Sequence, residues 1–368
     1  MENIRWVPFE IMENFIIDAF KGVGVPGEDA EICAKVLITA DKRGIDSHGV
    51  GRLKSIYIDR IQAGQINPIT AIEIIKEGPT TAVLDGHNGL GQVVAQKAMR
   101  LAIDKAKHYG LGMVAVRNSN HYGIAGYYSL MAIEQGMIGL TGTNARPSIA
   151  PTFGVENMLG TNPLTFGIPT DEEFPFMLDC ATSVSQRGKI EVYARLGKEI
   201  PEGWVIGQDG QSKTDAAVVL DDLIKSAAAL TPLGGIGEGG GGYKGYGYAT
   251  VVEILSAALQ DGAFLKELAG LKDDKKVPFR LGHFFIAINI ESFIELDKFK
   301  KITGDILRAL RASKKMPGAE KIYTAGEKEY LTWLKRKDQG VPLDEIEQHQ
   351  IMQLKQQLNL TKYNFEFE

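Results

Sequence analysis

The feature that most constrains the fold is an alternation of strand and helix that begins near residue 80 and is interrupted twice. Long segments at residues 145–162 and 184–242 break the alternation. A doubly wound sheet of the Rossmann type has short connections and would not contain them. The sequence therefore predicts an α+β fold of non-Rossmann type with a mixed sheet. The strand candidates are residues 81–84, 113–116, 137–143, 164–168, 176–178 and 284–290, and the helix candidates between them are residues 92–108, 127–134 and 246–259.

Both ends of the chain carry helical periodicity instead. Residues 9–20 place apolar side chains at helical spacing, and a second helix is expected from Pro26 to Gly44. A third helix is expected after the run at residues 46–52, with Leu53, Ile56, Tyr57 and Ile61 on its buried face. We expect residues 1–75 to form a helical domain that C-terminal helices, from about residues 301–368, complete. Residues 76–300 would form an α+β domain that binds cofactor and substrate. The helix candidates near the C-terminus are residues 299–312, 327–338 and 344–358.

The composition excludes several classes of function. Hydrophobic residues make up 44% and charged residues 24% of the 368 residues, as in a globular protein. A net charge of −5 argues against a nucleic-acid binder, which would present a basic face. No apolar run approaches the roughly 20 residues of a membrane span. Cys33 and Cys180 alone make neither a disulfide framework nor a zinc site. We expect a cytoplasmic protein without a metal site.

The run Asp46-Ser47-His48-Gly49-Val50-Gly51-Arg52 holds one of only six histidines. The histidine lies beside a hydroxyl and four positions before an arginine. A proton donor and a cation for a carboxylate, one helical turn apart, suit the reduction of a 2-oxo acid. The alternative interpretation is an ordinary helix start. If Ser47 caps the third helix, the helix dipole would favour a neutral His48.

Two glycine runs match the dinucleotide pattern GxGxxG, and neither follows a strand. Residues 22–27 contain Pro26, which has no N–H to offer a phosphate, so a turn between helices is the better interpretation. Residues 237–242 are followed by Lys244 and a predicted helix. Bare backbone amides, a lysine and a helix N-terminus favour phosphate binding, with a plain surface loop as the alternative.

Polar residues follow several of the predicted strands, where active-site groups are common. His121 lies in the run 118–123 after the strand near residue 113, and a role as a helix cap is its alternative interpretation. Residues 160–163 and 179–183 are weaker signals. The absence of HExxH, GxSxG and CxxC patterns argues against a zinc protease, a serine hydrolase or a thioredoxin-like protein.

Together these runs resemble the malate/L-lactate dehydrogenase family, which is separate from the Rossmann-type lactate and malate dehydrogenases. The family includes ureidoglycolate and sulfolactate dehydrogenases, diketogulonate reductase and piperideine-carboxylate reductase. Residues 186–193 and 201–204 look most like its malate dehydrogenase branch. The matching runs occur in family order over about residues 45–330: DSHG at 46–49, DGHNGLG at 85–91, NSNHYG at 118–123, GTNP at 160–163, DCATS at 179–183, GK at 188–189 and YKGYG at 243–247.

The resemblance implies a homodimeric enzyme that interconverts a 2-hydroxy acid and a 2-oxo acid with NAD or NADP. His48 would be the acid/base group with Ser47 beside it, although some members assign this role to the position of His121. Arg52 would hold the substrate carboxylate, and Thr161 would lie in the substrate pocket. The implied cofactor contacts are Asp179, Cys180, Ala181, Lys244, Ala325, Gly326 and Glu327.

This chain departs from the family pattern in two places. Residues 239–242 are all glycine, which leaves the cofactor contacts before Lys244 open. Some relatives have an acid at the position of Lys189, so no charge relay is carried over to it. The substrate stays open, because the residues that contact the part of the substrate beyond C2 are not marked in the sequence. The choice between NAD and NADP stays open, because no Rossmann acidic residue is present.

Overall fold

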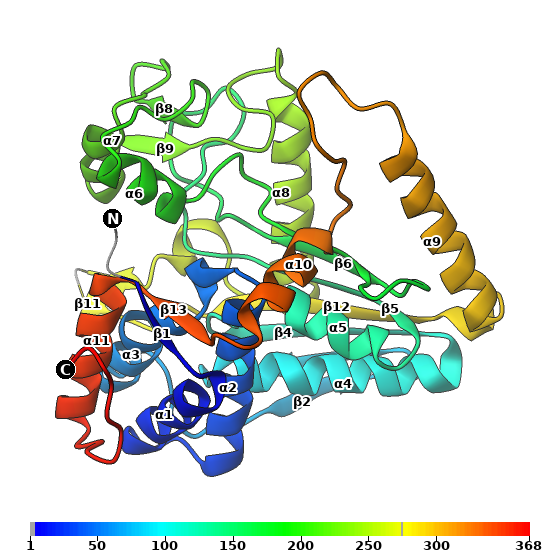
Figure 1. The fold of residues 1–368 in the computed structure, drawn as a ribbon, viewed down its shortest axis with the longest axis horizontal. Coiled ribbons are helices and arrows are strands. Elements are labelled where there is room, and N and C mark those ends of the chain that lie inside the picture. Colours follow the sequence, from blue (N-terminus) through cyan, green and yellow to red (C-terminus); the bar gives the residue numbers. More distant parts are fainter. Residues whose placement is uncertain (1–3, 274) are drawn as a thin grey trace.

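The computed structural model describes residues 4–273 and 275–368. Its centre is a seven-stranded mixed sheet in the order β2-β3-β4-β12-β5-β6-β7 (Figure 1). In this sheet β3 and β4 are parallel and the other neighbouring pairs are antiparallel, which confirms the α+β, non-Rossmann prediction. The strands are β2 (Glu73–Glu77), β3 (Thr81–Asp85), β4 (Leu111–Ser119), β5 (Met137–Thr143), β6 (Leu164–Ile168), β7 (Phe176–Cys180) and β12 (Leu281–Asn289).

Helices cover both faces of the sheet. On one face lie α4 (Gly91–Tyr109) and α5 (Gly126–Ile133), which share a buried cluster with Phe285 and Ala287 of β12. On the other face α8 (Gly242–Ala257) lies so close to β12 that a Cβ at Gly282 would be 1.6 Å from the Ser256 carbonyl oxygen. The long helix α9 (Leu296–Ala312) lies at the right of Figure 1, and its Arg308 binds Asp171 in the loop between β6 and β7.

The two ends of the chain share one hydrophobic core. Helices α1 (Phe9–Gly22), α2 (Gly27–Lys42) and α3 (Asp59–Gln62) pack with α11 (Glu345–Gln357), and Phe15 meets the rings of Tyr363 and Phe365 edge-on. Strand β1 (Arg5–Val7) pairs with β13 (Val341–Leu343), a contact that local periodicity did not indicate. Helix α10 (Glu327–Arg336) also packs against α2. The division into domains at residues 75 and 300 stays a prediction.

The long interruption at residues 184–242 forms a small lobe with its own core. It contains α6 (Arg187–Arg195), β8 (Val205–Gly207), α7 (Ala216–Ile224) and β9 (Ala228–Leu230) around Ile190, Val205 and Val219. The short hairpin of β10 (Leu271–Lys272) and β11 (Lys275–Lys276) follows α8. These elements are too short for their periodicity to separate them from loops in the sequence.

The predicted third helix is present over residues 53–62, with Leu53, Tyr57 and Ile61 buried as expected and Ile56 partly buried, but its first part and the run before it differ from a regular α-helix. Two 3-10 turns, Asp46–His48 and Val50–Arg52, precede a π-helical stretch, Leu53–Ile58, before α3 begins. Gly49 (φ −86°, ψ −146°) interrupts the helical path between the turns. Two glycines within three residues weaken a regular helix, so packing against neighbouring side chains decides the path here.

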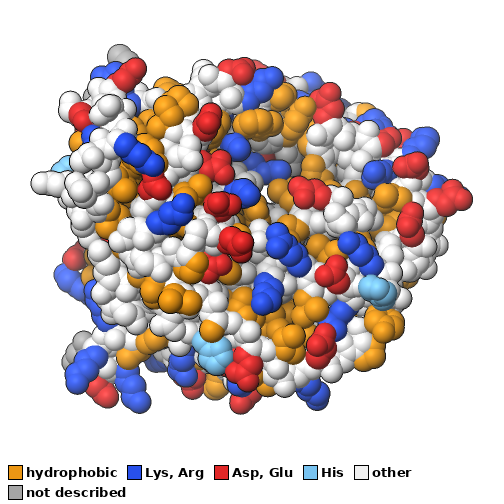
Figure 2. Space-filling model, turned by 90° about the horizontal axis from the view of Figure 1, so that it is seen from below, with side chains coloured by type: hydrophobic (Ala, Val, Ile, Leu, Met, Phe, Trp, Pro, Cys, Tyr) orange, Lys and Arg blue, Asp and Glu red, His pale blue; other side chains and the backbone are white. Residues whose placement is uncertain are grey.

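The described surface mixes charges of both signs. On the face seen in Figure 2, Lys and Arg side chains alternate with Asp and Glu, as the small net charge of −5 suggests. Within residues 4–273 and 275–368, no helix has both the length and the apolar character needed to cross a membrane.

The close approach of β12 and α8 gives a stability test. Gly282→Ala should lower Tm by about 3 °C or more, because the new methyl group would overlap a backbone oxygen. Gly247→Ala is the matched control. Its Cβ would meet nothing within 4 Å and alanine favours a helix, so Tm should stay constant or rise. Equal changes of Tm in thermal unfolding would contradict this account of the packing.

Candidate active site

The run at residues 46–52 places a histidine and an arginine side by side. The Ser47 hydroxyl lies 2.9 Å from Nδ1 of His48, and Arg52 Nε donates a hydrogen bond to the Ser47 carbonyl oxygen. Ser47 therefore does not cap a helix, contrary to the expectation from the sequence. Its side chain orients His48 and its backbone orients Arg52.

His121 reaches the same place from the end of β4. Its ring stacks on His48 with 5.6 Å between ring centroids and 20° between planes. The hydroxyl of the fully buried Tyr57 lies 2.7 Å from Nδ1 of His121. Each histidine thus has a hydroxyl at Nδ1, and neither Nε2 atom has a hydrogen bond to a described residue. This arrangement leaves two ring nitrogens available for one substrate.

Both histidines are held neutral. Burial, together with the positive charge of Arg52, lowers the pKa of His48 to about 4. Burial, followed by the charges of His48, Arg60 and Arg52, places the pKa of His121 well below its ordinary value. The expectation of a neutral His48 is supported, but desolvation and Arg52 replace the helix dipole as its cause.

Further cations lie around this pair. Burial lowers the pKa of Arg60 to about 10, and the nearby charges of Arg146 and Arg52 add to the effect. The Arg60 guanidinium lies 4.3 Å from the centre of the Phe279 ring. A Cβ at Gly188, in α6, would be 3.9 Å from Nη2 of Arg52, so the small lobe approaches the site. The concentrated positive charge suits an anionic ligand.

Sequence reasoning missed Tyr57 and Arg60 as site residues, and Arg146 as well. Tyr57 was assigned to a buried helix face, which hides a polar role. Arg60 lies eight residues after Arg52, a spacing that is common on any exposed helix. Arg146 comes from the loop after β5, and no spacing in the sequence relates it to the run at residues 46–52.

Three of the predicted cofactor and substrate segments meet around Thr182. Its backbone N–H and hydroxyl donate to the Thr161 carbonyl oxygen at 3.0 and 3.2 Å. Its own carbonyl oxygen accepts a hydrogen bond of 2.8 Å from the N–H of Leu233, directly before the glycine-rich loop. That loop leads into α8, where Lys244 is exposed in the first turn. Residues 179–181 and the glycine-rich loop are therefore neighbours, although they are far apart in sequence.

The segment from Ala325 to Glu327 joins this group through β7. The Met177 N–H donates to the Ala325 carbonyl oxygen at 3.2 Å. Gly326 has φ +92°, and a Cβ there would lie 2.5 Å from the Pro175 carbonyl oxygen, so the position requires glycine. The Glu327 carboxylate accepts a hydrogen bond of 3.2 Å from the Thr324 N–H and is therefore engaged within the protein.

The Asp179 carboxylate is engaged in the same way. It accepts hydrogen bonds from the Gly126 N–H, at the start of α5, and from the Thr165 hydroxyl, at 2.7 and 2.9 Å. A small cavity, lined in part by Asp179, Arg43 and Ile45, lies between β7 and the end of α2. Arg43 and Ile45 lie just before the run at residues 46–52 in the sequence, so this cavity lies between that part of the chain and the predicted cofactor segment at Asp179.

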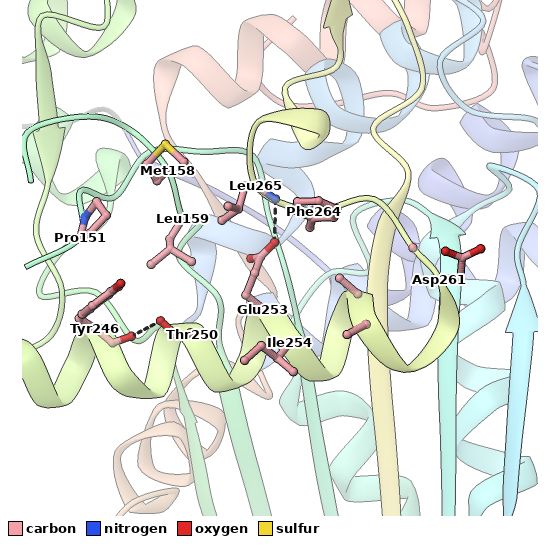
Figure 3. Close-up of a pocket in the computed structure, with 13 residues that line it drawn as sticks. Pro151, Met158, Leu159, Tyr246, Thr250, Glu253, Ile254, Asp261, Phe264 and Leu265 are labelled. Carbon is pink, nitrogen blue, oxygen red and sulfur yellow. Dashed lines mark hydrogen bonds between the residues drawn. The ribbon is translucent and has the colours of Figure 1, made fainter.

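A larger cavity of about 500 Å³ lies elsewhere, along α8 (Figure 3). Its wall is mostly apolar, with Leu159, Ile254 and Phe264 among the lining residues. The Glu253 carboxylate accepts a hydrogen bond of 2.9 Å from the Leu265 N–H at its edge. No histidine or arginine lines this cavity, so it lacks a proton donor and a cation for a carboxylate.

Comparison with known proteins decides the family. Residues 7–352 match the malate/L-lactate dehydrogenase family. The chain belongs to this family. It is 48% identical to the malate dehydrogenase of Pyrococcus abyssi, over 93% of this chain and 92% of the relative. It is 42% identical to the L-sulfolactate dehydrogenase of Methanocaldococcus jannaschii, over 95% and 96%. The crystal structure of malate dehydrogenase from Entamoeba histolytica superposes with a TM-score of 0.94 at 46% identity, over 99% of this chain and all (100%) of that one.

Family membership confirms the resemblance that the motifs indicated. The protein is an oxidoreductase that acts on a hydroxy acid, and its non-Rossmann sheet is the one its structural relatives share.

The neutral state of His48 can be measured directly. In histidine-labelled protein, NMR titration should show that His48 gains its proton only near pH 4. Arg52→Gln should raise this pKa toward its ordinary value of about 6.5, because one positive charge is removed. His283 is the internal control, because burial lowers its pKa to about 3 and Arg52 does not contribute to that value. A His48 pKa that stays the same in Arg52→Gln would contradict the proximity of the two side chains.

Proposed function

We propose that the protein is an NAD(P)-dependent dehydrogenase that interconverts malate and oxaloacetate. The observation that carries this proposal is the stacked pair His48 and His121 beside Arg52, which joins a proton acceptor to a carboxylate-binding cation. The similarity to the malate dehydrogenases of Pyrococcus abyssi and Entamoeba histolytica supports the choice of malate.

Arg52 binds the carboxylate at C1 of the substrate in this proposal. Its Nε is already used by the Ser47 carbonyl oxygen, so Nη1 and Nη2 form the fork that meets the two carboxylate oxygens. This bond would fix the C2 carbon and its oxygen relative to the two histidines. Catalysis by orientation of this kind is among the largest contributions that binding groups make.

His48 exchanges the proton of the C2 hydroxyl. Its Nε2 is unprotonated when Nδ1 donates to the Ser47 hydroxyl, and this form accepts the proton during oxidation. His121 is the alternative acid/base group, with the Tyr57 hydroxyl at its Nδ1 in place of that of Ser47. Its Nδ1 also accepts the Gly123 N–H at 3.4 Å, which favours a proton on Nε2 and suits donation during reduction. A pKa near 4 keeps the acceptor form of His48 dominant at neutral pH. A bound dianion would raise that pKa and make proton uptake easier.

The positive charge of the site supports a substrate with two negative charges. Arg60 and Arg146 add two cations to Arg52, which is more than one carboxylate needs. Malate carries a second carboxylate at C4 and sulfolactate carries a sulfonate, whereas lactate carries neither. Sulfolactate is therefore the second candidate, and the 42% identity to a sulfolactate dehydrogenase supports it. Lactate and ureidoglycolate, each with a single negative charge, are weaker candidates.

The cofactor segments fit a nicotinamide dinucleotide. The glycine-rich loop and the exposed Lys244 at the start of α8 offer backbone N–H groups and a charge to phosphates. The carboxylates of Asp179 and Glu327 already accept hydrogen bonds within the protein, so those residues would contact the cofactor through their backbone. When bound, the cofactor supplies hydride transfer with C2 of the substrate. Thr161 would lie on the substrate side.

We also propose a homodimer in the cytoplasm. Tyr248, Val251 and Ile254 of α8 are 57%, 48% and 53% exposed, and such apolar residues favour an association surface. Cys33 and Cys180 are both free thiols, which suits a reducing compartment.

A substrate panel with both cofactors tests the proposed reaction. Malate should give the highest kcat/KM and sulfolactate the next, and lactate should be at least tenfold lower because it has a single charge. Assays with NAD and with NADP, followed by nicotinamide absorbance, measure each case. Binding of NADH without turnover of any 2-oxo acid would instead indicate a non-catalytic nucleotide-binding protein.

Substitutions test the individual roles. His48→Ala should lower kcat by about 10²–10⁴-fold, as expected for a lost acid/base group. Near-normal activity would transfer the role to His121, for which His121→Ala is the matched variant.

Arg52→Lys should raise KM for malate about tenfold or more, because a point charge replaces the planar fork. If KM is unchanged, Arg52 does not bind the substrate.

A further inference from the structure

The C-terminal part of the chain contacts the run at residues 46–52 and the end of α2. In Figure 1, α10 and α11 lie beside the N-terminal helices. Arg336, the last residue of α10, donates from Nη1 to the Asp41 carbonyl oxygen at 2.6 Å. The same guanidinium binds both oxygens of the Asp46 carboxylate, at 2.5 and 2.9 Å. Arg336 thus connects the end of α2 with the first residue of the run.

Two carboxyl groups lie against the backbone at the two glycines of the run. The Asp41 side chain is only 2% exposed, and its Oδ2 accepts the Val50 N–H at 3.0 Å. A Cβ at Gly49 would lie 1.7 Å from Oδ1 of Asp41, and one at Gly51 would lie 2.5 Å from Oε1 of Glu347. Gly49 therefore leaves the room that the buried Asp41 carboxylate occupies, and Gly51 allows the Glu347 carboxylate to approach the backbone.

The charges in this cluster depend on Arg336. The cluster contains three carboxyl groups, those of Asp41, Asp46 and Glu347, and the charge of Arg336 acts on all three. Arg195 also acts on Glu347. Burial raises the pKa of Asp41 well above its usual range and that of Glu347 to about 7. The Arg336 side chain is 14% exposed, so its bidentate bond to Asp46 is better shielded from water than an ordinary surface pair.

We propose that Arg336 is a positioning residue for the dehydrogenase reaction, and that it clamps the run at residues 46–52 through Asp46 and Asp41 so that His48 and Arg52 face the substrate together. The proposal rests on the proposed roles of His48 and Arg52. It assigns to the C-terminal helices a part in the reaction, since Arg336 and Glu347 come from α10 and α11.

The conformation of the run explains why it needs such a clamp. Asp46–Arg52 consists of two 3-10 turns around Gly49, without the continuous hydrogen bonds of an α-helix. The position of His48 and Arg52 therefore depends on what packs behind them. A displacement of about 1 Å in a reacting group can reduce the rate by as much as 10²-fold.

Arg336→Gln tests the clamp, and Arg308→Gln is the matched control. Arg308 on α9 also binds an aspartate bidentately, at 2.9 and 3.1 Å from Asp171, and lies outside the site. We expect Arg336→Gln to raise KM for the hydroxy acid about tenfold and to lower kcat, while KM for the cofactor stays within about twofold. Arg308→Gln should leave all three constants unchanged. Loss of active protein alone would lower kcat without changing KM, and that result would overturn the proposal.

A double-mutant cycle and a conservative variant sharpen the test. Asp46→Asn should raise KM by a factor similar to that of Arg336→Gln, and the double variant should be no worse than the poorer single variant. Strictly multiplicative effects would show that the two residues act independently and would refute the clamp. Arg336→Lys, which keeps the charge but not the fork, should give an intermediate KM.

An NMR readout separates this proposal from the proposed function. In Arg336→Gln, the pKa of His48 should rise from about 4, because a loosened run admits water to the ring. This measurement does not require turnover. A wild-type protein that oxidises no 2-hydroxy acid would overturn the proposed reaction, whereas an unchanged His48 pKa in Arg336→Gln would overturn the clamp.

Discussion

The insertion of β12 between β4 and β5 is the contact on which the rest of the structure depends. Residues 281–289 bond to both neighbours and so join β2-β3-β4 and β5-β6-β7 into one sheet. Phe284 and Phe285 are buried on opposite faces, against the α8 side and against the cluster of α4 and α5. This antiparallel insertion excludes a Rossmann arrangement and directs the end of β4, with His121, toward the N-terminal helices.

The site combines two polar rings with several cations at the junction of three parts of the molecule. His48 comes from the helical end of the chain, His121 from the sheet, and Gly188 approaches Arg52 from the small lobe. Burial removes water from both imidazole rings, which disfavours their charged forms. Both histidines therefore stay neutral. The hydroxyls of Ser47 and Tyr57 lie beside Nδ1 of each ring, and among the described residues no hydrogen bond reaches either Nε2.

Most of the regular elements follow from local pattern. The strand predicted at residues 137–143 and that at 164–168 coincide with β5 and β6, and the helix predicted at 344–358 differs from α11 by one residue at each end. Long amphipathic or apolar segments allow this accuracy because burial and periodicity agree. Local pattern does not predict the 3-10 turns at residues 46–52, because their path follows from packing against Asp41 and Glu347.

The sequence alone determined the family and the α+β class, because these follow from motifs and from short-range periodicity, and it supplied His48, Arg52 and His121 as predicted site residues. The pairing of His48 with His121, the presence of Tyr57 and Arg60 beside them, and the contact of Arg336 with Asp46 came only from the tertiary structure. Asp46 and Arg336 are 290 positions apart, and the chain pattern contains no signal for contacts between such distant residues. Such contacts form because apolar faces from both ends of the chain share one core, and this packing brings the polar residues beside those faces together.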